Sequence, residues 1–144
     1  MAYQNVAGQC ERTYTFLEWC KKRRINIDFV REAWVDKKGT GTQSHPSYAL
    51  DLNVEKGKRT IVYWRKRLDG AAKVIREDKR LALVEVWGHK LEGIYADGKL
   101  SGVAWKAWLE SLNEADCLVG DWNAHNQAWD PLNEDDIRGK DMEE

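Results

Sequence analysis

Between positions 118 and 130 the chain contains the run Leu118-Val119-Gly120-Asp121-Trp122-Asn123-Ala124-His125, followed by Asn126 and by Trp129-Asp130. A short apolar stretch ends at a glycine, and Asp, Asn and His then stand at every second position. If the segment stays extended, Asp121, Asn123 and His125 lie on one face, because side chains alternate along a strand. A carboxylate, an amide and an imidazole at the end of a buried strand suit a phosphate or metal site. Asp and Asn also favour turns, so a plain polar loop is the alternative interpretation.

The composition is typical of a soluble globular protein, and the length predicts a single domain, residues 1–144. Hydrophobic residues make up 42% of the chain, charged residues 33%, and the formal net charge is −1. No apolar run approaches the roughly 20 residues of a membrane span, and the N-terminus lacks a signal pattern. Cys10, Cys20 and Cys117 lack metal-type spacing. They predict reduced thiols in an intracellular protein, cytoplasmic or nuclear, with Cys20 and Cys117 as small core residues.

Apolar periodicity predicts many strands and two helices. Strands are expected at 3–7, 25–34, 48–53, 60–66, 73–77, 81–87, 90–95 and, as a buried strand, 115–120. One helix is expected at 11–24, and another after Ser101, with its apolar stripe at Trp105, Trp108, Leu109 and Leu112. This pattern fits sheets that carry helices on one face and pack on another sheet with the other. The acidic residues 133–144 are either a disordered tail or the start of an interrupted helix.

Further polar residues fall near the ends of these predicted strands. Asn5 lies near the end of the first strand, Glu32 in the second and Tyr95 at the end of the strand 90–95, while His45 precedes the strand at 48. An acid, an amide and a phenol so placed fit a site at one edge of a sheet. Each residue alone is weak support, because a carboxylate at a strand end is more often simply solvated.

In order and spacing, these segments resemble the endonuclease/exonuclease/phosphatase superfamily, and more closely the endonuclease domains of non-LTR (LINE-type) retrotransposon reverse transcriptases. The matching segments are Asn5, Arg31-Glu32-Ala33-Trp34, Gly93-Ile94-Tyr95 and the run from Gly120 to Trp129. They correspond to the family's first-strand Asn and its "QEPW", "NVY" and "GDFNAHHxxW" motifs, and the resemblance extends from Tyr3 to about Gly139. It implies an α/β (α+β) fold, the N-terminal portion of a four-layer α/β sandwich of the DNase I-like type, with mixed, mostly antiparallel sheets and flanking helices.

The resemblance also implies an activity, a metal-dependent phosphodiesterase that nicks DNA by water attack. Glu32 would hold Mg²⁺ (or Mn²⁺) with support from Asn5, since these hard cations take oxygen ligands. Asp121 would be the general base, and Asn123 and Tyr95 would contact the phosphate. The remaining residues, His125, Trp129 and His45, would bind substrate.

Departures from the family pattern leave other functions open. Arg31 replaces the usual Gln before the metal-binding Glu, and Ala33 replaces the Pro after it. Family domains continue to a late Asp and an "SDH"-like motif, for which these 144 residues hold no counterpart. We therefore expect a truncated domain that is inactive by itself and forms a homodimer through an exposed strand edge. The alternatives are a non-catalytic binding or structural remnant of the fold, and a phosphatase acting on a lipid or inositol phosphate.

Overall fold

The computed structural model describes residues 1–39, 41–50, 60–78, 80–96, 99–100, 102–112 and 114–124. These residues belong to two compact units. Unit 1 comprises Met1–Tyr95 and Ala115–Gly120, and unit 2 comprises Ala96–Glu114 and Asp121–Glu144. Several predictions fall outside the described residues: the end of the strand 48–53, the cap at Ser101, the side chains of His125 and Trp129, and the segment 133–144.

Unit 1 is built on two four-stranded sheets joined by a 3-10 turn, η1 (Lys66–Leu68). The first sheet has the order β1-β2-β4-β3, with β1 at Ala2–Asn5, β2 at Ile27–Arg31, β3 at Tyr48–Leu50 and β4 at Thr60–Arg65. The second has the order β5-β6-β7-β8, with β5 at Ala72–Glu77, β6 at Leu81–Val86, β7 at His89–Tyr95 and β8 at Cys117–Asp121. The register shows β1 parallel to β2, and antiparallel pairing for β2–β4, β3–β4, β5–β6 and β6–β7. The expected mixed, mostly antiparallel sheets are confirmed.

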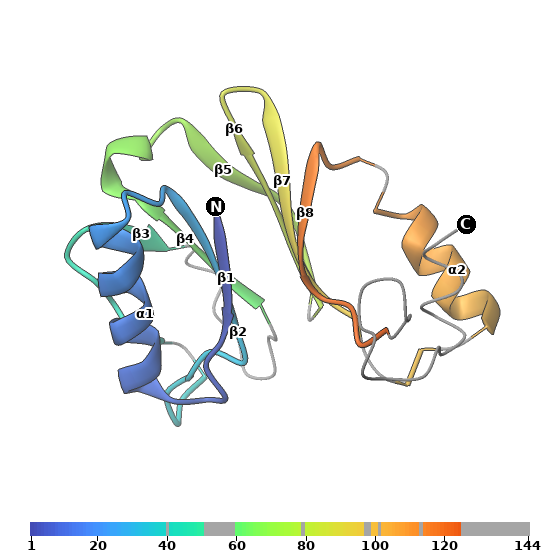
Figure 1. Ribbon diagram of the computed structural model, residues 1–144, viewed down its shortest axis with the longest axis horizontal. Helices are drawn as coiled ribbons and strands as arrows, with labels where there is room; N and C mark the ends of the chain where they lie inside the picture. Colours follow the sequence, from blue (N-terminus) through green and yellow to red (C-terminus); the bar gives the residue numbers. More distant parts are fainter. Residues whose placement is uncertain are drawn as a thin grey trace. The chain divides into compact units, whose positions relative to one another are not determined.

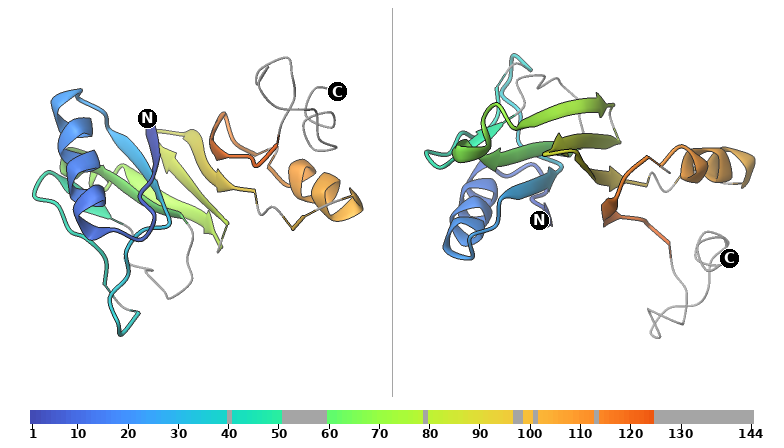
Figure 2. Two further views of the ribbon diagram at one scale, coloured as in Figure 1. Left: turned by 60° about the horizontal axis from the view of Figure 1, so that its bottom comes forward. Right: turned by 90° about the horizontal axis from the view of Figure 1, so that it is seen from above.

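The helix α1 (Cys10–Lys22) forms because its apolar residues recur at helical spacing. Thr13, Phe16, Leu17 and Cys20 make the stripe that it buries, as the periodicity predicted. Lys21 and Lys22 lie in the last turn, where positive charge favours the helix dipole. The helix therefore covers one face of the first sheet (Figures 1 and 2).

Two cores separate three layers of unit 1, which are α1, the first sheet and the second sheet (Figure 1). Successive residues of β2 point to opposite faces, so Val30 joins the core against α1 and Phe29 joins the core between the sheets. Gly93 on β7 lies directly against Phe29, and a Cβ there would overlap the ring. The close approach of the two sheets at this point therefore requires glycine.

Two predictions about burial were wrong. The strand β8 was expected to be buried, but it is at the edge of its sheet, with Cys117 and Leu118 exposed. Cys20 is buried as predicted, whereas Cys117 is not a core residue. An apolar run does not distinguish a central strand from an edge strand, because both bury at least one face.

Unit 2 contains α2 (Gly102–Glu110), where the second helix was predicted. Trp105 is its buried residue, and the Trp105 and Trp108 rings lie 5.4 Å apart between centroids. None of the helices that the structure describes combines the length and the apolar character needed to cross a bilayer.

Candidate active site

The strands β1 and β2 end side by side, which brings the first two predicted residues to one end of the sheet. The parallel register pairs Asn5 with Arg31, the residue before Glu32. Beyond the strands, the Val6 amide donates to the Arg31 carbonyl at 3.1 Å, and the Gly8 amide donates to the Glu32 carbonyl at 2.6 Å. These hydrogen bonds hold the two strand-end loops together, so Asn5 and Glu32 occupy neighbouring positions, as the sequence predicted.

The loops that carry these residues adopt strained backbone conformations. Ala7 and Glu32 have φ angles of 49° and 48°, in the left-handed region that residues with a Cβ rarely adopt. The Asn5 Oδ1 accepts a hydrogen bond from the Ala7 amide at 2.8 Å and so helps to hold this turn. Strain of this kind costs of order 1–3 kcal/mol and collects at functional sites.

Arg31 connects Glu32 to the second sheet. Its Nη2 lies 3.1 Å from the Glu32 Oε1, and its guanidinium carbon lies 3.8 Å from the centroid of the Tyr95 ring. Tyr95 is the last residue of β7, so the end of the second sheet meets the ends of β1 and β2 here. Unit 1 therefore brings Asn5, Glu32 and Tyr95 together. Sequence reasoning noted Arg31 only as a departure from the family and gave it no place in the site.

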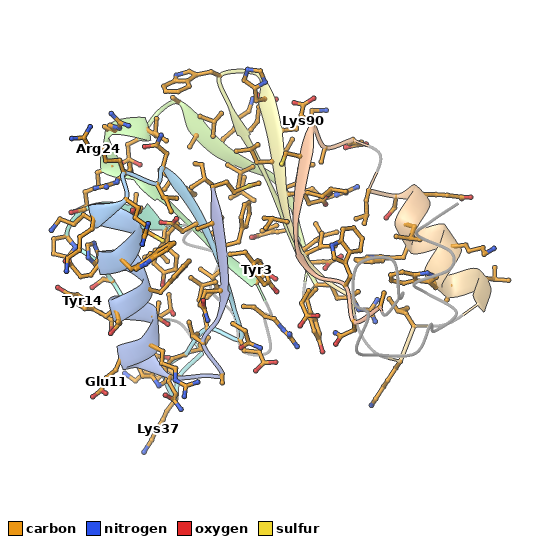
Figure 3. The ribbon with its side chains drawn as sticks, in the orientation of Figure 1. Tyr3, Glu11, Tyr14, Arg24, Lys37 and Lys90 are labelled. Carbon is orange, nitrogen blue, oxygen red and sulfur yellow. The ribbon has the colours of Figure 1, made fainter. Side chains whose placement is uncertain are left out.

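Tyr3 is a further residue of this cluster that sequence reasoning missed. It projects from β1 toward the core between the sheets (Figure 3). Burial raises the pKa of Tyr3 to about 12, the positive charge of Arg31 opposes this rise, and Glu32 and Tyr95 add to it. The hydroxyl is buried, and no residue that the structure describes hydrogen-bonds to it. Its spacing from Asn5, two positions along β1, was the signal that could have found it.

Asp121 and Asn123 form a tight turn in unit 2. The Asp121 Oδ1 accepts the Asn123 amide at 3.1 Å, and the Asn123 Nδ2 donates to the Ala96 carbonyl at 2.7 Å. The Ala96 amide in turn donates to the Asp121 carbonyl at 2.8 Å. Asn123 has a φ of 46°, so the extended alternation expected through this segment stops at Asp121. The reason is the turn-forming preference of Asp and Asn, which was the alternative interpretation of this run.

The turn keeps the two side chains close to each other, although it breaks the strand. Trp122, between them, packs on α2 with its ring centroid 6.3 Å from that of Trp108. Asp121 and Asn123 are thus held by backbone bonds and by an aromatic anchor within unit 2. That they converge with Asn5, Glu32 and Tyr95 stays a prediction.

His45 lies in the core region beside α1. Its Nε2 is 2.8 Å from the Glu18 Oε1, and its Nδ1 accepts the Ser47 amide at 3.1 Å. The ring also contacts Tyr14 and Tyr48, and the side chain is fully buried. Both ring nitrogens therefore have partners within the protein. These contacts give His45 a role in packing beside α1.

The side chains at this end of unit 1 include one carboxylate, that of Glu32, and one amide, that of Asn5. No cluster of three or more His, Cys, Asp or Glu side chains occurs in the described part of the chain. Mg²⁺ needs few protein ligands, usually one or two carboxylates, and fills its shell with water and substrate phosphate. Glu32 and Asn5 could supply one carboxylate oxygen and one amide oxygen to such an ion. A metal ion bound to Glu32 would share that carboxylate with Arg31.

A cavity of about 590 Å³ lies between α1 and β1. Its lining includes Asn5 and Tyr3 from β1 and Arg12, Phe16 and Trp19 from α1. The cavity therefore reaches the candidate site at Asn5 but does not include Glu32.

Comparison with solved structures identifies the fold. The chain is similar to the endonuclease domain of TRAS1, a telomere-specific non-LTR retrotransposon, with a TM-score of 0.69 and 16% identity over 98% of this chain and 67% of that one. It is also similar to D. rerio TDP2 complexed with single strand DNA product, with a TM-score of 0.55 and 15% identity over 88% of this chain and 60% of that one. A D. rerio TDP2 humanized by 14 mutations matches with a TM-score of 0.50 and 16% identity over 94% of this chain and 66% of that one.

The chain thus spans between 60% and 67% of the length of these structures. No protein-family model and no curated protein sequence matches it. At these identities the likeness concerns the fold. Together with the two stacked sheets of unit 1, it shows that this chain has a DNase I-like fold.

Proposed function

We propose that the chain is part of a divalent-metal-dependent phosphodiesterase of the retrotransposon endonuclease type, which nicks DNA inside the cell, in the cytoplasm or nucleus. The observation that carries this proposal is the meeting of Asn5, Glu32 and Tyr95 at one end of unit 1. Asn5 and Tyr95 end strands of different sheets, and Glu32 directly follows β2. Strand packing alone does not require an amide, a carboxylate and a phenol there, whereas a carboxylate can hold a metal ion and an amide and a phenol can hydrogen-bond a phosphate.

Each residue has a distinct role in this proposal. Glu32, with Asn5, would hold Mg²⁺ or Mn²⁺, and the bound metal would offset the negative charge that builds on the phosphoryl oxygens. Asp121 would take the proton from the attacking water. Asn123 and the Tyr95 hydroxyl would orient the phosphate, and His125 and Trp129 would contact the DNA. Asp121 and Asn123 belong to one hydrogen-bonded turn, which keeps these two side chains close to each other.

DNA is the proposed substrate for two reasons. The "GDWNAH...W" run of this chain resembles that of retrotransposon endonucleases. One of the similar solved structures is a telomere-specific retrotransposon endonuclease domain, and another contains a single-stranded DNA product. Neither reason fixes a target sequence.

Metal-dependent DNA binding tests the proposal directly. A fluorescent DNA duplex should bind the chain more tightly with Mg²⁺ than with EDTA, as measured by anisotropy. Glu32→Gln should remove the Mg²⁺-dependent increment, and Glu110→Gln, at an exposed position of α2, should keep it. Equal increments for wild type and Glu32→Gln would show that Glu32 holds no metal.

We also propose that these 144 residues do not complete the reaction efficiently by themselves. The family's late Asp and "SDH"-like motif would support the transition state, and one lost preorganised donor typically costs roughly 100- to 1000-fold in rate. Nicking of supercoiled plasmid by the 144 residues with Mg²⁺ should therefore fall below detection. Robust nicking that disappears in Asp121→Ala would show instead that the site is complete without that motif.

A non-catalytic remnant of the fold is the second candidate, and one observation favours it. Arg31 already neutralises the Glu32 carboxylate at 3.1 Å. A remnant would stay folded and show no Mg²⁺-dependent DNA binding in any variant.

A further inference from the structure

Arg31 occupies an unusual position for a cation. It belongs to β2, where its neighbours are core residues, and only 8% of its surface is exposed. Its guanidinium places a positive charge beside the Glu32 carboxylate. A permanent charge in a buried position must be held by specific partners, because its removal from water is costly.

Contacts of the guanidinium include the Glu32 carboxylate and the Tyr95 ring. The Glu32 carboxylate lies 3.1 Å from Nη2, and the face of the Tyr95 ring lies 3.8 Å from the guanidinium carbon. An arginine stacked on an aromatic ring gains both cation–π and packing energy, which a flexible ammonium gains less well. Arg31 therefore ties the residue proposed to hold metal to the residue proposed to contact phosphate.

A divalent metal on Glu32 would meet this charge at close range. The metal and the guanidinium compete for the same carboxylate, and they repel each other. The repulsion is screened less than in bulk water, because the Arg31 side chain is only 10% exposed and that of Glu32 is 29% exposed. A neutral glutamine, the residue typical of the family at this position, would bring no such competition.

We infer that the Arg31 side chain supplies a positive charge at the metal site, an inference that rests on the proposed function. This side chain positions Glu32 and Tyr95 when no metal is bound, and it lowers the affinity of the site for Mg²⁺. Arg31 is thus a positioning residue that sets the metal concentration at which the site fills.

Calorimetric titration of the chain with Mg²⁺ alone tests this inference. Arg31→Gln should bind Mg²⁺ about 10-fold more tightly than wild type, because the substitution removes the positive charge that lies 3.1 Å from the Glu32 carboxylate. Arg31→Lys keeps the positive charge beside Glu32 and should therefore bind Mg²⁺ within about 3-fold of wild type. Arg67→Gln removes an exposed charge of unit 1 and should bind as wild type does.

A second variant covers the case in which Arg31→Gln does not fold, which circular dichroism would reveal. Tyr95→Leu removes the ring beneath the guanidinium, so Arg31 is held less firmly against Glu32. This variant should also bind Mg²⁺ more tightly than wild type, with a smaller gain than Arg31→Gln.

Glu32→Gln, alone and combined with Arg31→Gln, separates this inference from the proposed function. Loss of Mg²⁺ binding in both, with tighter binding in Arg31→Gln, supports the two together. Equal or weaker binding in Arg31→Gln than in wild type, while binding still depends on Glu32, overturns the inference and leaves the metal site in place. Binding that ignores Glu32 in every variant, or no binding in any variant, overturns the proposed metal site itself.

Discussion

Asp28 is a carboxylate buried in the first sheet, on the same face of β2 as Val30 and therefore toward α1. Neither of its oxygens has a hydrogen bond of normal geometry among the described residues. Burial raises its pKa from 3.8 to about 6, and the neighbouring Cys20 and Tyr48 side chains act in the opposite direction. Asp28 is outside the candidate site. The free-energy cost of burying its carboxylate therefore lowers only the stability of the fold.

The free energy of unfolding should therefore fall as the pH rises from about 4 to about 6. Below the unfolded pKa of 3.8 the carboxyl is protonated in both states and costs nothing. Between the two pKa values the unfolded state loses a proton that the folded state keeps, so rising pH favours unfolding. Above the folded pKa the penalty is constant, and a rise of this size corresponds to roughly 3 kcal/mol.

Asp28→Asn should remove most of this penalty, because an amide of the same shape cannot ionise. Urea unfolding should show the variant more stable than wild type at pH 7 and similar to it at pH 4. Glu110→Gln, on the exposed face of α2, serves as the control and should keep the wild-type pH profile. A variant with the same pH dependence as wild type would show that Asp28 is not the group responsible.

At the scale of the element, the strands and helices were predictable because their signals are local. The alternation in β2 and the stripe of α1 are properties of consecutive residues, and both predictions were confirmed within a few positions. The turn at Asn123 was predicted only as the alternative to an extended segment, because the hydrogen bond from its side chain to the Ala96 carbonyl joins it to another segment of the chain. The position of Arg31 was not predicted, since no sequence pattern shows that it stacks on Tyr95.

The packing of β7 against β2 can be tested at Gly93. A Cβ at Gly93 would overlap the Phe29 ring, so Gly93→Ala should push the two sheets apart. Overpacking a core typically costs about 1–3 kcal/mol, and chemical denaturation should show a loss of that size. Because Tyr95 lies two residues further along β7, the variant should also disturb the candidate site.

A double-mutant cycle identifies the cause of that loss. Phe29→Leu shortens the side chain that Gly93 faces, so Phe29→Leu with Gly93→Ala should be more stable than the sum of the two single effects predicts. Strictly additive effects would mean that Gly93 is required for another reason.

At the scale of the whole molecule, both sheets have an edge that the described residues leave without a second neighbour. The strand β1 pairs only with β2 among the described strands, and β8 is last in the order of its sheet. An unpaired edge presents backbone donors and acceptors in register and so favours association with another strand. The edge at β8 also carries an exposed apolar side chain, Leu118, which is 36% exposed.

We therefore expect the chain to self-associate through β8, most simply as a two-fold symmetric dimer. Analytical ultracentrifugation over a range of concentrations, with the exposed Cys117 kept reduced, should show a monomer–dimer equilibrium. Leu118→Lys should shift it toward monomer, since charged side chains discourage edge pairing. Val103→Lys changes a side chain that is 86% exposed on α2 and should leave the equilibrium unchanged. A monomer at every concentration would exclude association, and an equal shift in both variants would point to general charge repulsion instead of an interface at β8.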